Sequence, residues 1–288
     1  MKILVIGLDS FIAQKFLKYN ESFFTVMGVS MKNTRTPNEI VLSSFDSLDK
    51  DLFSDMDVVI NFAGIVHRPD LKDFEIYDEV NHKLAVKNAL IAKKAGVKLF
   101  VQMSTIAVYG NSEIIDITTP CKPTTPYGIS KLNADIELIG LQDENFKIAI
   151  VRPPMVYGGS KSPGNLSRLI KLINKGLPLP FDCINNQRHF IHVNNLVQYL
   201  GIIAKNGLNG VFLVCDKIPV STTKLLQTIA QNTKKNVIFF KLPKYLLLLF
   251  KVLFPSEYIK LFKSSVIHSN FPAIYPIEEF GIVDEKFE

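Results

Sequence analysis

Short apolar runs alternate with longer amphipathic segments along the first half of this chain. The apolar runs have the length of strands, and the segments between them repeat apolar residues at a helical spacing. We expect strands at Lys2–Ile6, Phe24–Ser30, Val58–Phe62, Leu99–Met103 and Lys147–Arg152, and helices at Ile12–Tyr19, Tyr77–Ala95 and Thr125–Leu141. Strands and helices in this order are typical of βαβ units, so the sequence predicts an α/β fold with a doubly wound parallel sheet.

The turn after the first predicted strand has the spacing of a dinucleotide-binding loop. Gly7 supplies the glycine of a tight turn, and Ser10 and Ala13 are small residues at the two later positions. Small residues there let the backbone approach a pyrophosphate at the N-terminus of the following helix. We therefore expect Gly7, Ser10, Phe11 and Ile12 to contact a dinucleotide.

The end of the second predicted strand is where such sites contact the adenosine ribose. A carboxylate there would bond the 2′-hydroxyl and repel a 2′-phosphate. Residues 30–35, SMKNTR, contain no acid, and Ser30, Lys32 and Arg35 could bind a phosphate. The sequence therefore favours NADP(H) as cofactor. NAD(H) stays possible, because the basic residues could equally belong to a solvated loop.

Small residues follow the strand predicted to end at Phe62. Ala63 and Gly64, together with Phe62, would let the cofactor lie across the ends of the strands. The strand order reverses there, and open α/β sheets bind ligands at such a point. His67 is a candidate substrate contact, although a histidine in this place is more often an ordinary loop residue. Asn81, in the next predicted helix, is expected to brace the strand that follows it.

Tyr127 and Lys131 lie four residues apart in a predicted helix, so their side chains would share one face. A free tyrosine has a pKa of about 10, and a nearby cation favours the phenolate. The pair could therefore exchange a proton in alcohol–ketone chemistry. The spacing also arises by chance, and its weight depends on the motifs around it.

Three motifs carry a family resemblance: STIAVYG at residues 104–110, Tyr127-x-x-x-Lys131, and RPPMVYG at residues 152–158. With them, residues 2 to about 250 resemble the extended short-chain dehydrogenase/reductases of the nucleotide-sugar epimerase/dehydratase family. The resemblance implies that Thr105 bonds the substrate oxygen and Tyr127 exchanges its proton, while Lys131 holds the ribose hydroxyls and lowers the tyrosine pKa. It also implies that Pro153 and Val156 contact the cofactor.

The residues after Thr105 narrow the expected reaction. Dehydratases of the family follow this threonine with an Asp-Glu pair, because elimination needs its own acid and base. Ile106 and Ala107 stand at those positions, so dehydration is not expected. The expected chemistry is hydride transfer, either to reduce a ketosugar or to oxidise and re-reduce one in an epimerase.

The segment after Arg152 is expected to hold the sugar nucleotide. By the resemblance, Asn165 reaches the diphosphate region, Leu179 lies in a uridine-binding turn, and Arg188 pairs with the diphosphate. A guanidinium suits that role because its planar fork of donors engages phosphate oxygens in pairs.

The length of 288 residues and the 47% hydrophobic content suit a large domain with a smaller lobe. We expect a Rossmann-type dinucleotide-binding domain at residues 1–154 and 186–217, and a nucleotide-sugar-binding lobe at residues 155–185 and 218–288. The three cysteines lack metal-ligand spacing, so no metal site is expected. The net charge of +6 comes without a dense basic run, so nucleic-acid binding is not expected either.

The most lipid-like segment is LPKYLLLLFKVLF, residues 242–254. It is too short to span a bilayer, so we expect no integral membrane segment and a buried or lobe-packing helix, with membrane-surface or partner contact as the alternative. No secretory signal opens the chain, which favours a cytoplasmic protein. By the resemblance, the helices at 77–95 and 125–141 would form a homodimer interface.

The combination of GIVH at residues 64–67, RPPMVYG, and Pro-Gly-Asn at 163–165 resembles bacterial reductases of UDP-4-keto-6-deoxy-N-acetylhexosamines, enzymes of capsule and O-antigen synthesis. The implied reaction passes hydride from NAD(P)H to C4 of the UDP-linked 4-keto sugar while Tyr127 protonates O4. The product would be a UDP-linked N-acetylfucosamine or N-acetylquinovosamine. Two alternatives stay open: a UDP-N-acetylhexosamine 4-epimerase that keeps NAD bound, and a non-catalytic dinucleotide sensor.

Overall fold

A computed structural model describes residues 1–66, 73–158 and 165–271 of the chain. The described residues form a seven-stranded sheet in which each strand pair is parallel, in the order β10-β7-β5-β4-β1-β2-β3. Its strands are β1 (Lys2–Ile6), β2 (Thr25–Ser30), β3 (Glu39–Val41), β4 (Val58–Asn61), β5 (Leu99–Met103), β7 (Lys147–Arg152) and β10 (Gly210–Leu213). The predicted doubly wound α/β fold is confirmed.

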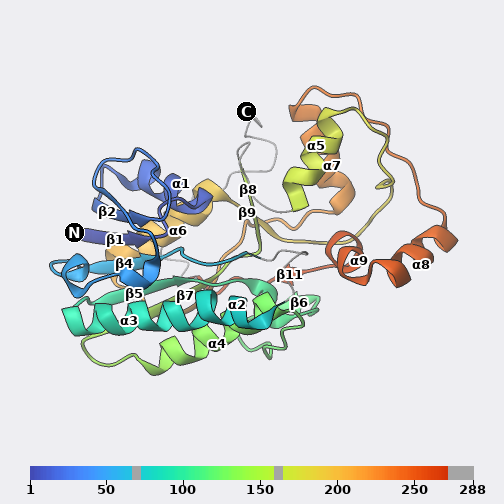
Figure 1. The fold of residues 1–288 in the computed structure, drawn as a ribbon. Coiled ribbons are helices and arrows are strands. Elements are labelled where there is room, and N and C mark those ends of the chain that lie inside the picture. Colours follow the sequence, from blue (N-terminus) through green and yellow to red (C-terminus); the bar gives the residue numbers. More distant parts are fainter. Residues whose placement is uncertain (67–72, 159–164, 272–288) are drawn as a thin grey trace.

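Helices cover both faces of the sheet (Figure 1). One face carries α1 (Phe11–Asn20) and α6 (Val193–Asn206). The other carries α2 (Phe74–Asp78), the π-helical turn η3 (Glu79–Lys83), α3 (Leu84–Ala95) and α4 (Pro126–Gly140), with the short 3-10 turns η1 (Phe45–Ser47), η2 (Lys50–Phe53) and η4 (Ile106–Tyr109) nearby in the chain.

Both faces of each central strand are buried. In β1, Ile3 and Val5 pack in the cluster with α1 and α6, whereas Leu4 and Ile6 pack in the cluster with α3 and α4. Side chains alternate between the two faces of a strand, so a strand covered on both sides needs apolar residues at nearly every position. This requirement explains the unbroken apolar runs in the sequence.

A smaller lobe lies beside the sheet (Figure 1). Its helices are α5 (Asn165–Asn174), α7 (Thr222–Asn232), α8 (Lys244–Leu253) and α9 (Pro255–Phe262). Its core packs Ile173, Leu226 and Ile229 around Tyr157. Two short parallel pairs complete the described strands: β8 (Met155–Tyr157) with β9 (Phe190–His192), and β6 (Ile114–Ile115) with β11 (Val266–Ile267).

Residues 242–254 were expected to form a buried or lobe-packing helix. The structure shows a helix that packs on the lobe and is not buried, because α8, which the structure describes in full, has no buried residue. It contacts the lobe through one side, where Phe250 packs edge-on against Phe262 of α9. In the described part of the chain, no helix combines the length and the apolar content needed to cross a bilayer.

Candidate active site

The turn after β1 presses against the end of β4, where the strand order reverses. Gly7 has φ +85°, and a Cβ on it would lie 2.7 Å from the backbone nitrogen of Ala63, so the position requires glycine. The N–H groups of Gly7 and Leu8 donate to the carbonyl oxygen of Val29 at 2.8 and 2.9 Å. The turn is thereby held between the ends of β2 and β4.

Helix α1 begins directly after this turn. Ser10 is its N-cap, and its Oγ accepts from the N–H of Ala13 at 3.2 Å. Phe11 and Ile12 form the first turn, in which no acidic side chain occurs. The half-buried Phe62 and the buried Ala63 lie opposite, and Gly64 follows them at the surface. A helix N-terminus beside small residues suits a pyrophosphate, so the predicted dinucleotide residues are brought together here.

A carboxylate stands at the end of β2, although residues 30–35 contain none. The buried Ser30 donates from Oγ to Oε1 of Glu39, on β3, at 2.5 Å. The backbone N–H of Thr34 donates to the same carboxylate at 3.0 Å, and its Oγ1 donates at 2.9 Å. Burial acts to raise the pKa of Glu39, but these hydrogen bonds outweigh it and lower that pKa. An ionised carboxylate therefore lies beside Ser30, and the residue before Ser30, Val29, accepts the hydrogen bonds of the Gly7 turn.

Glu39 could not be singled out from the sequence, because β2 and β3 pair across a loop. Parallel pairing sets Gly28 opposite Glu39 and Ser30 opposite Val41, and a short strand like β3 leaves little signal in the sequence. Lys32 and Arg35, proposed as phosphate ligands, are exposed on that loop.

Thr105, Tyr127 and Lys131 come together at the end of β5. Thr105 caps η4, and its side chain is hydrogen-bonded to the hydroxyl of Tyr127, which lies in the first turn of α4. Lys131, one turn further along α4, is 5% exposed and donates from Nζ to the carbonyl oxygen of Met103 at 3.0 Å. Residues four apart on a helix share a face, which accounts for the common position of the tyrosine and the lysine.

The pKa of Tyr127 differs from the sequence expectation. Lys131 was expected to lower it, but burial raises the pKa of Tyr127 to about 12, against the smaller lowering effect of the Thr105 hydrogen bond. Burial also lowers the pKa of Lys131 to about 8, since a charged group is disfavoured away from water. The phenol is therefore protonated at neutral pH and is set up as a proton donor.

A buried ion pair underlies the three residues. Asp135, one turn beyond Lys131 on α4, is 0% exposed and accepts from Ser104 Oγ at 2.8 Å and from Arg152 Nε at 2.9 Å. Arg152 also donates to the hydroxyl of Tyr109 at 2.7 Å. The pair fixes the end of β7 against α4. Asp135 was not among the predicted site residues, although its place four residues after Lys131 puts it on the same helix face.

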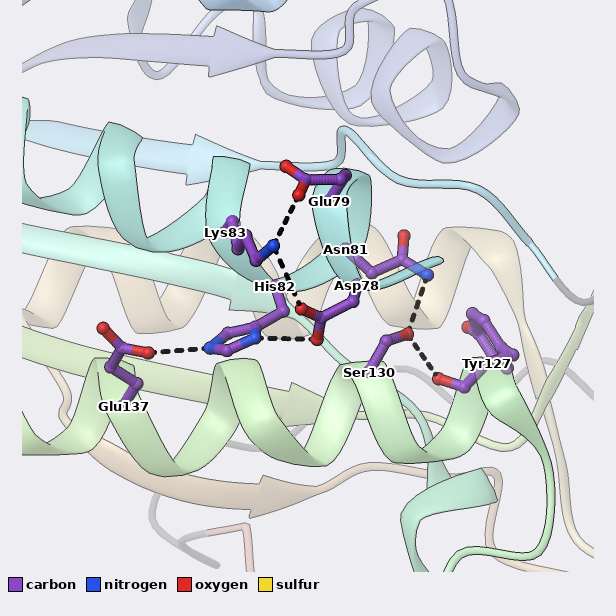
Figure 2. Close-up of polar contacts among 8 residues, drawn as sticks. All are labelled: Asp78, Glu79, Asn81, His82, Lys83, Tyr127, Ser130 and Glu137. Carbon is purple, nitrogen blue, oxygen red and sulfur yellow. Dashed lines mark hydrogen bonds and ion pairs between the residues drawn. The ribbon is translucent and has the colours of Figure 1, made fainter. Parts of the chain in front are cut away.

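Asn81, in the π-helical turn η3, connects the loop after β4 to α4 (Figure 2). It exchanges two hydrogen bonds with the backbone of Ile65, at 2.8 and 3.0 Å, and donates to Ser130 Oγ at 3.2 Å. Ser130 in turn donates to the carbonyl oxygen of Tyr127 at 3.0 Å. Asn81 was expected to brace the strand that follows it; instead it braces the loop that precedes it, because the side chain points inward from η3.

Three other side chains of the same turn, those of Glu79, His82 and Lys83, also make polar contacts (Figure 2). His82 bridges Asp78 of α2 and Glu137 of α4, at 2.9 and 2.7 Å. Lys83 pairs with Glu79 and lies 3.8 Å from Asp78. These contacts join α2 and η3 to α4, and so support the helix that carries Tyr127 and Lys131.

Of the remaining predicted substrate residues, three lie away from the Thr105–Tyr127–Lys131 group in the sequence: Asn165, Leu179 and Arg188. Arg188 donates from Nη1 to the carbonyl oxygens of Ile259 and Lys263 at the end of α9. Leu179, expected at the uridine, is 3% exposed and packs in the core of the lobe, so its side chain stabilises the lobe. Asn165 is the first residue of α5. His67 lies outside the described residues.

Two residues that follow β7, Pro153 and Val156, were expected to contact the cofactor. Pro153 is buried, and its carbonyl oxygen accepts from the N–H of Ile106 at 3.1 Å. Val156 is half-buried and packs against the core beneath α1 and α6. Within the part of the chain that the structure describes, no group of His, Cys, Asp or Glu side chains could hold a metal ion.

A parallel sheet with a glycine turn at the strand reversal, and a Thr105–Tyr127–Lys131 group at the end of β5, together define a short-chain dehydrogenase/reductase. The model of the NAD dependent epimerase/dehydratase family matches residues 3–215. The chain belongs to this family.

Two of the relatives of known name are sugar epimerases. UDP-glucose 4-epimerase of Vibrio cholerae is 36% identical over 185 residues, which are 60% of this chain and 56% of that protein, so the match spans just over half of the relative. N-acetyl-α-D-glucosaminyl-diphospho-ditrans,octacis-undecaprenol 4-epimerase of Escherichia coli O157:H7 is 27% identical over 252 residues, 84% of this chain and 75% of that protein. The fold matches UDP-glucuronic acid 4-epimerase from Bacillus cereus in complex with NAD, with a TM-score of 0.79 and 20% identity over 99% of this chain and 95% of that one.

Proposed function

We propose that this protein is a nicotinamide-dependent reductase of a UDP-linked 4-keto-6-deoxy-N-acetylhexosamine. The observation that carries the proposal is the half-buried, protonated phenol of Tyr127, hydrogen-bonded to Thr105 at the end of β5, with Ile106 and Ala107 following where elimination would need carboxylates. A site with one proton donor and no second acid–base pair suits the reduction of a ketone.

The chain's own residues account for the proton in this reaction. The Gly7 turn and the acid-free N-terminus of α1 fit a dinucleotide, which when bound supplies the hydride to C4 of the sugar. Tyr127 donates its phenol proton to O4, and Thr105 donates a hydrogen bond to the same oxygen. The C4 carbonyl thus becomes an alcohol. Lys131, held at the base of the site, stabilises the phenolate until solvent restores its proton.

The direct test of this function is cofactor oxidation. Purified protein is given NADH or NADPH and the 4-keto product of a UDP-N-acetylglucosamine 4,6-dehydratase, and absorbance of the reduced cofactor is followed. We expect one cofactor oxidised for each ketone consumed. Absence of oxidation with both cofactors would reject the reductase.

A 4-epimerase is the second candidate, and the names of the two relatives favour it. An epimerase oxidises and re-reduces the same sugar, so it needs no external reductant. Protein that carries stoichiometric NAD after purification, and interconverts UDP-N-acetylhexosamines without added cofactor, would establish the epimerase in place of the reductase.

For the cofactor, we propose that Glu39 selects NAD(H). The preference for NADP(H) rested on the lack of an acid after β2, and Glu39 supplies one from β3. Replacing Glu39 with Gln is expected to lower the preference for NADH over NADPH, measured as the ratio of kcat/KM values, by about tenfold or more, because it removes a negative charge that repels the 2′-phosphate. Glu21→Gln, an exposed acid after α1, is the control. A wild-type enzyme that prefers NADPH would contradict this role.

We also propose that the lobe, residues 155–185 and 218–288, holds the UDP-linked sugar, with Arg188 and Asn165 toward the diphosphate. The hydrogen bonds from Arg188 to the end of α9 support this, since a guanidinium fixed by carbonyls is pre-oriented for phosphate.

A homodimer would form over α3 and α4, where Leu90, Ile129 and Ile136 are exposed.

A further inference from the structure

Helix α8 exposes a continuous apolar stripe. Tyr245, Leu248, Leu249 and Val252 follow the i, i+3, i+4, i+7 spacing of one helix face, and they are 72%, 62%, 52% and 70% exposed. Soluble proteins seldom leave an apolar patch of this kind uncovered without a binding role. We call these four residues the α8 stripe.

The other side of α8 already has its partner. Leu247 and Phe250 are the half-buried residues of the helix, and the ring of Phe250 contacts the ring of Phe262 on α9 at 6.1 Å. They lie on the side of the helix away from the α8 stripe, given the helical spacing. Figure 1 places α8 at the outer end of the lobe. The stripe is therefore turned outward on an anchored helix.

The charge around α8 is one-sided. Residues 217–256 contain seven lysines and no Asp or Glu, whereas the whole chain has 33 basic and 27 acidic residues, so the rest of it is close to neutral. Lys244 and Lys251 are seven residues apart, both exposed, and border the α8 stripe along one edge. An apolar stripe with a lysine border is typical of a helix that lies in a membrane interface.

We propose that α8 docks this protein on an anionic membrane surface. The α8 stripe would enter the boundary of headgroups and acyl chains, with the helix parallel to the surface, and Lys244 and Lys251 would meet acidic headgroups. A second copy of the chain is the weaker occupant, because a twofold contact through the same face would bring its lysines against each other. The inference does not depend on the reaction at Tyr127.

Vesicle flotation with the full chain tests this docking. The protein is mixed with vesicles of phosphatidylcholine alone, or of phosphatidylcholine and phosphatidylglycerol in equal parts, at low and high salt. We expect flotation with the anionic vesicles and loss of it at high salt, because screening weakens attraction between lysines and headgroups. The triple variant Leu248→Gln, Leu249→Gln, Val252→Gln should bind at least about tenfold more weakly, since it removes the buried apolar area.

The control is Phe23→Gln, which changes a comparably exposed apolar residue (64%) after α1 and should bind as the wild type does. The double variant Lys244→Gln, Lys251→Gln should lose the difference between the two vesicle types. Failure of the wild type to float with anionic vesicles overturns the proposal. So does a concentration-dependent dimer that the triple variant abolishes, which would assign α8 to a second copy.

Discussion

Replacing Tyr127 with Phe is expected to lower kcat for reduction of the sugar ketone by about 10²–10⁴-fold, the usual contribution of a positioned general acid. The substitution removes the phenol proton and leaves the ring, which packs edge-on against Tyr77 with centroids 6.2 Å apart. Folding and cofactor binding should therefore persist. Steady-state kinetics, with cofactor affinity measured by fluorescence, separate the chemical step from binding.

Tyr77→Phe provides the matched control for this variant. Tyr77 is 1% exposed, and its hydroxyl donates to the carbonyl oxygen of Val66 at 3.4 Å. We expect its kcat to stay within a few-fold of the wild type. Equal losses of kcat in the two variants would mean that the tyrosines act through packing. Full activity in Tyr127→Phe would show that Tyr127 is not the proton donor.

Replacing Asp135 with Ala is expected to lower the free energy of unfolding by about 3–5 kcal/mol, because it leaves the guanidinium of Arg152 buried without its carboxylate. The pair is enclosed: the side chains of Asp135 and Arg152 are 0% and 8% exposed. Burial acts to raise the pKa of Asp135, and Arg152 is the strongest of the groups that oppose this effect. Urea denaturation measures the loss.

A double-mutant cycle identifies the origin of that loss. The cycle compares Asp135→Leu and Arg152→Met with the double variant that carries both substitutions. The double variant has both charges replaced by apolar groups, so it should be more stable than the sum of the losses in the two single variants predicts. Glu79→Gln breaks the solvent-exposed pair with Lys83 and should change stability far less. Strictly additive losses at Asp135 and Arg152 would contradict the buried pair as the stabilising contact.

The sheet and the reactive group could be predicted because their signals are local. Burial on both faces made β1 an apolar run, the conformation of Gly7 required a glycine, and a four-residue spacing placed Tyr127 and Lys131 on one side of α4. Each of these three signals can be read from residues that are neighbours in the sequence, within one strand, one tight turn or one turn of helix.

The features that sequence reasoning missed depend on contacts across the fold. Glu39 reaches Ser30 only through the pairing of β3 with β2, and Asp135 meets Arg152 only once β7 lies beneath α4. The exposure of α8 was missed for a different reason. An amphipathic pattern such as that of Leu248 and Val252 predicts an apolar face, but it does not tell whether the protein core or an external surface covers that face.

In the proposed reaction, C4 and O4 of a UDP-linked 4-keto sugar receive one hydride and one proton at this site. Mass spectrometry of the product formed with NADH dideuterated at C4 of the nicotinamide tests it most directly, because the label follows the hydride from either face of the ring. We expect a 6-deoxy sugar with a single deuterium on C4. An unlabelled product, as an epimerase with its own bound cofactor would give, contradicts it.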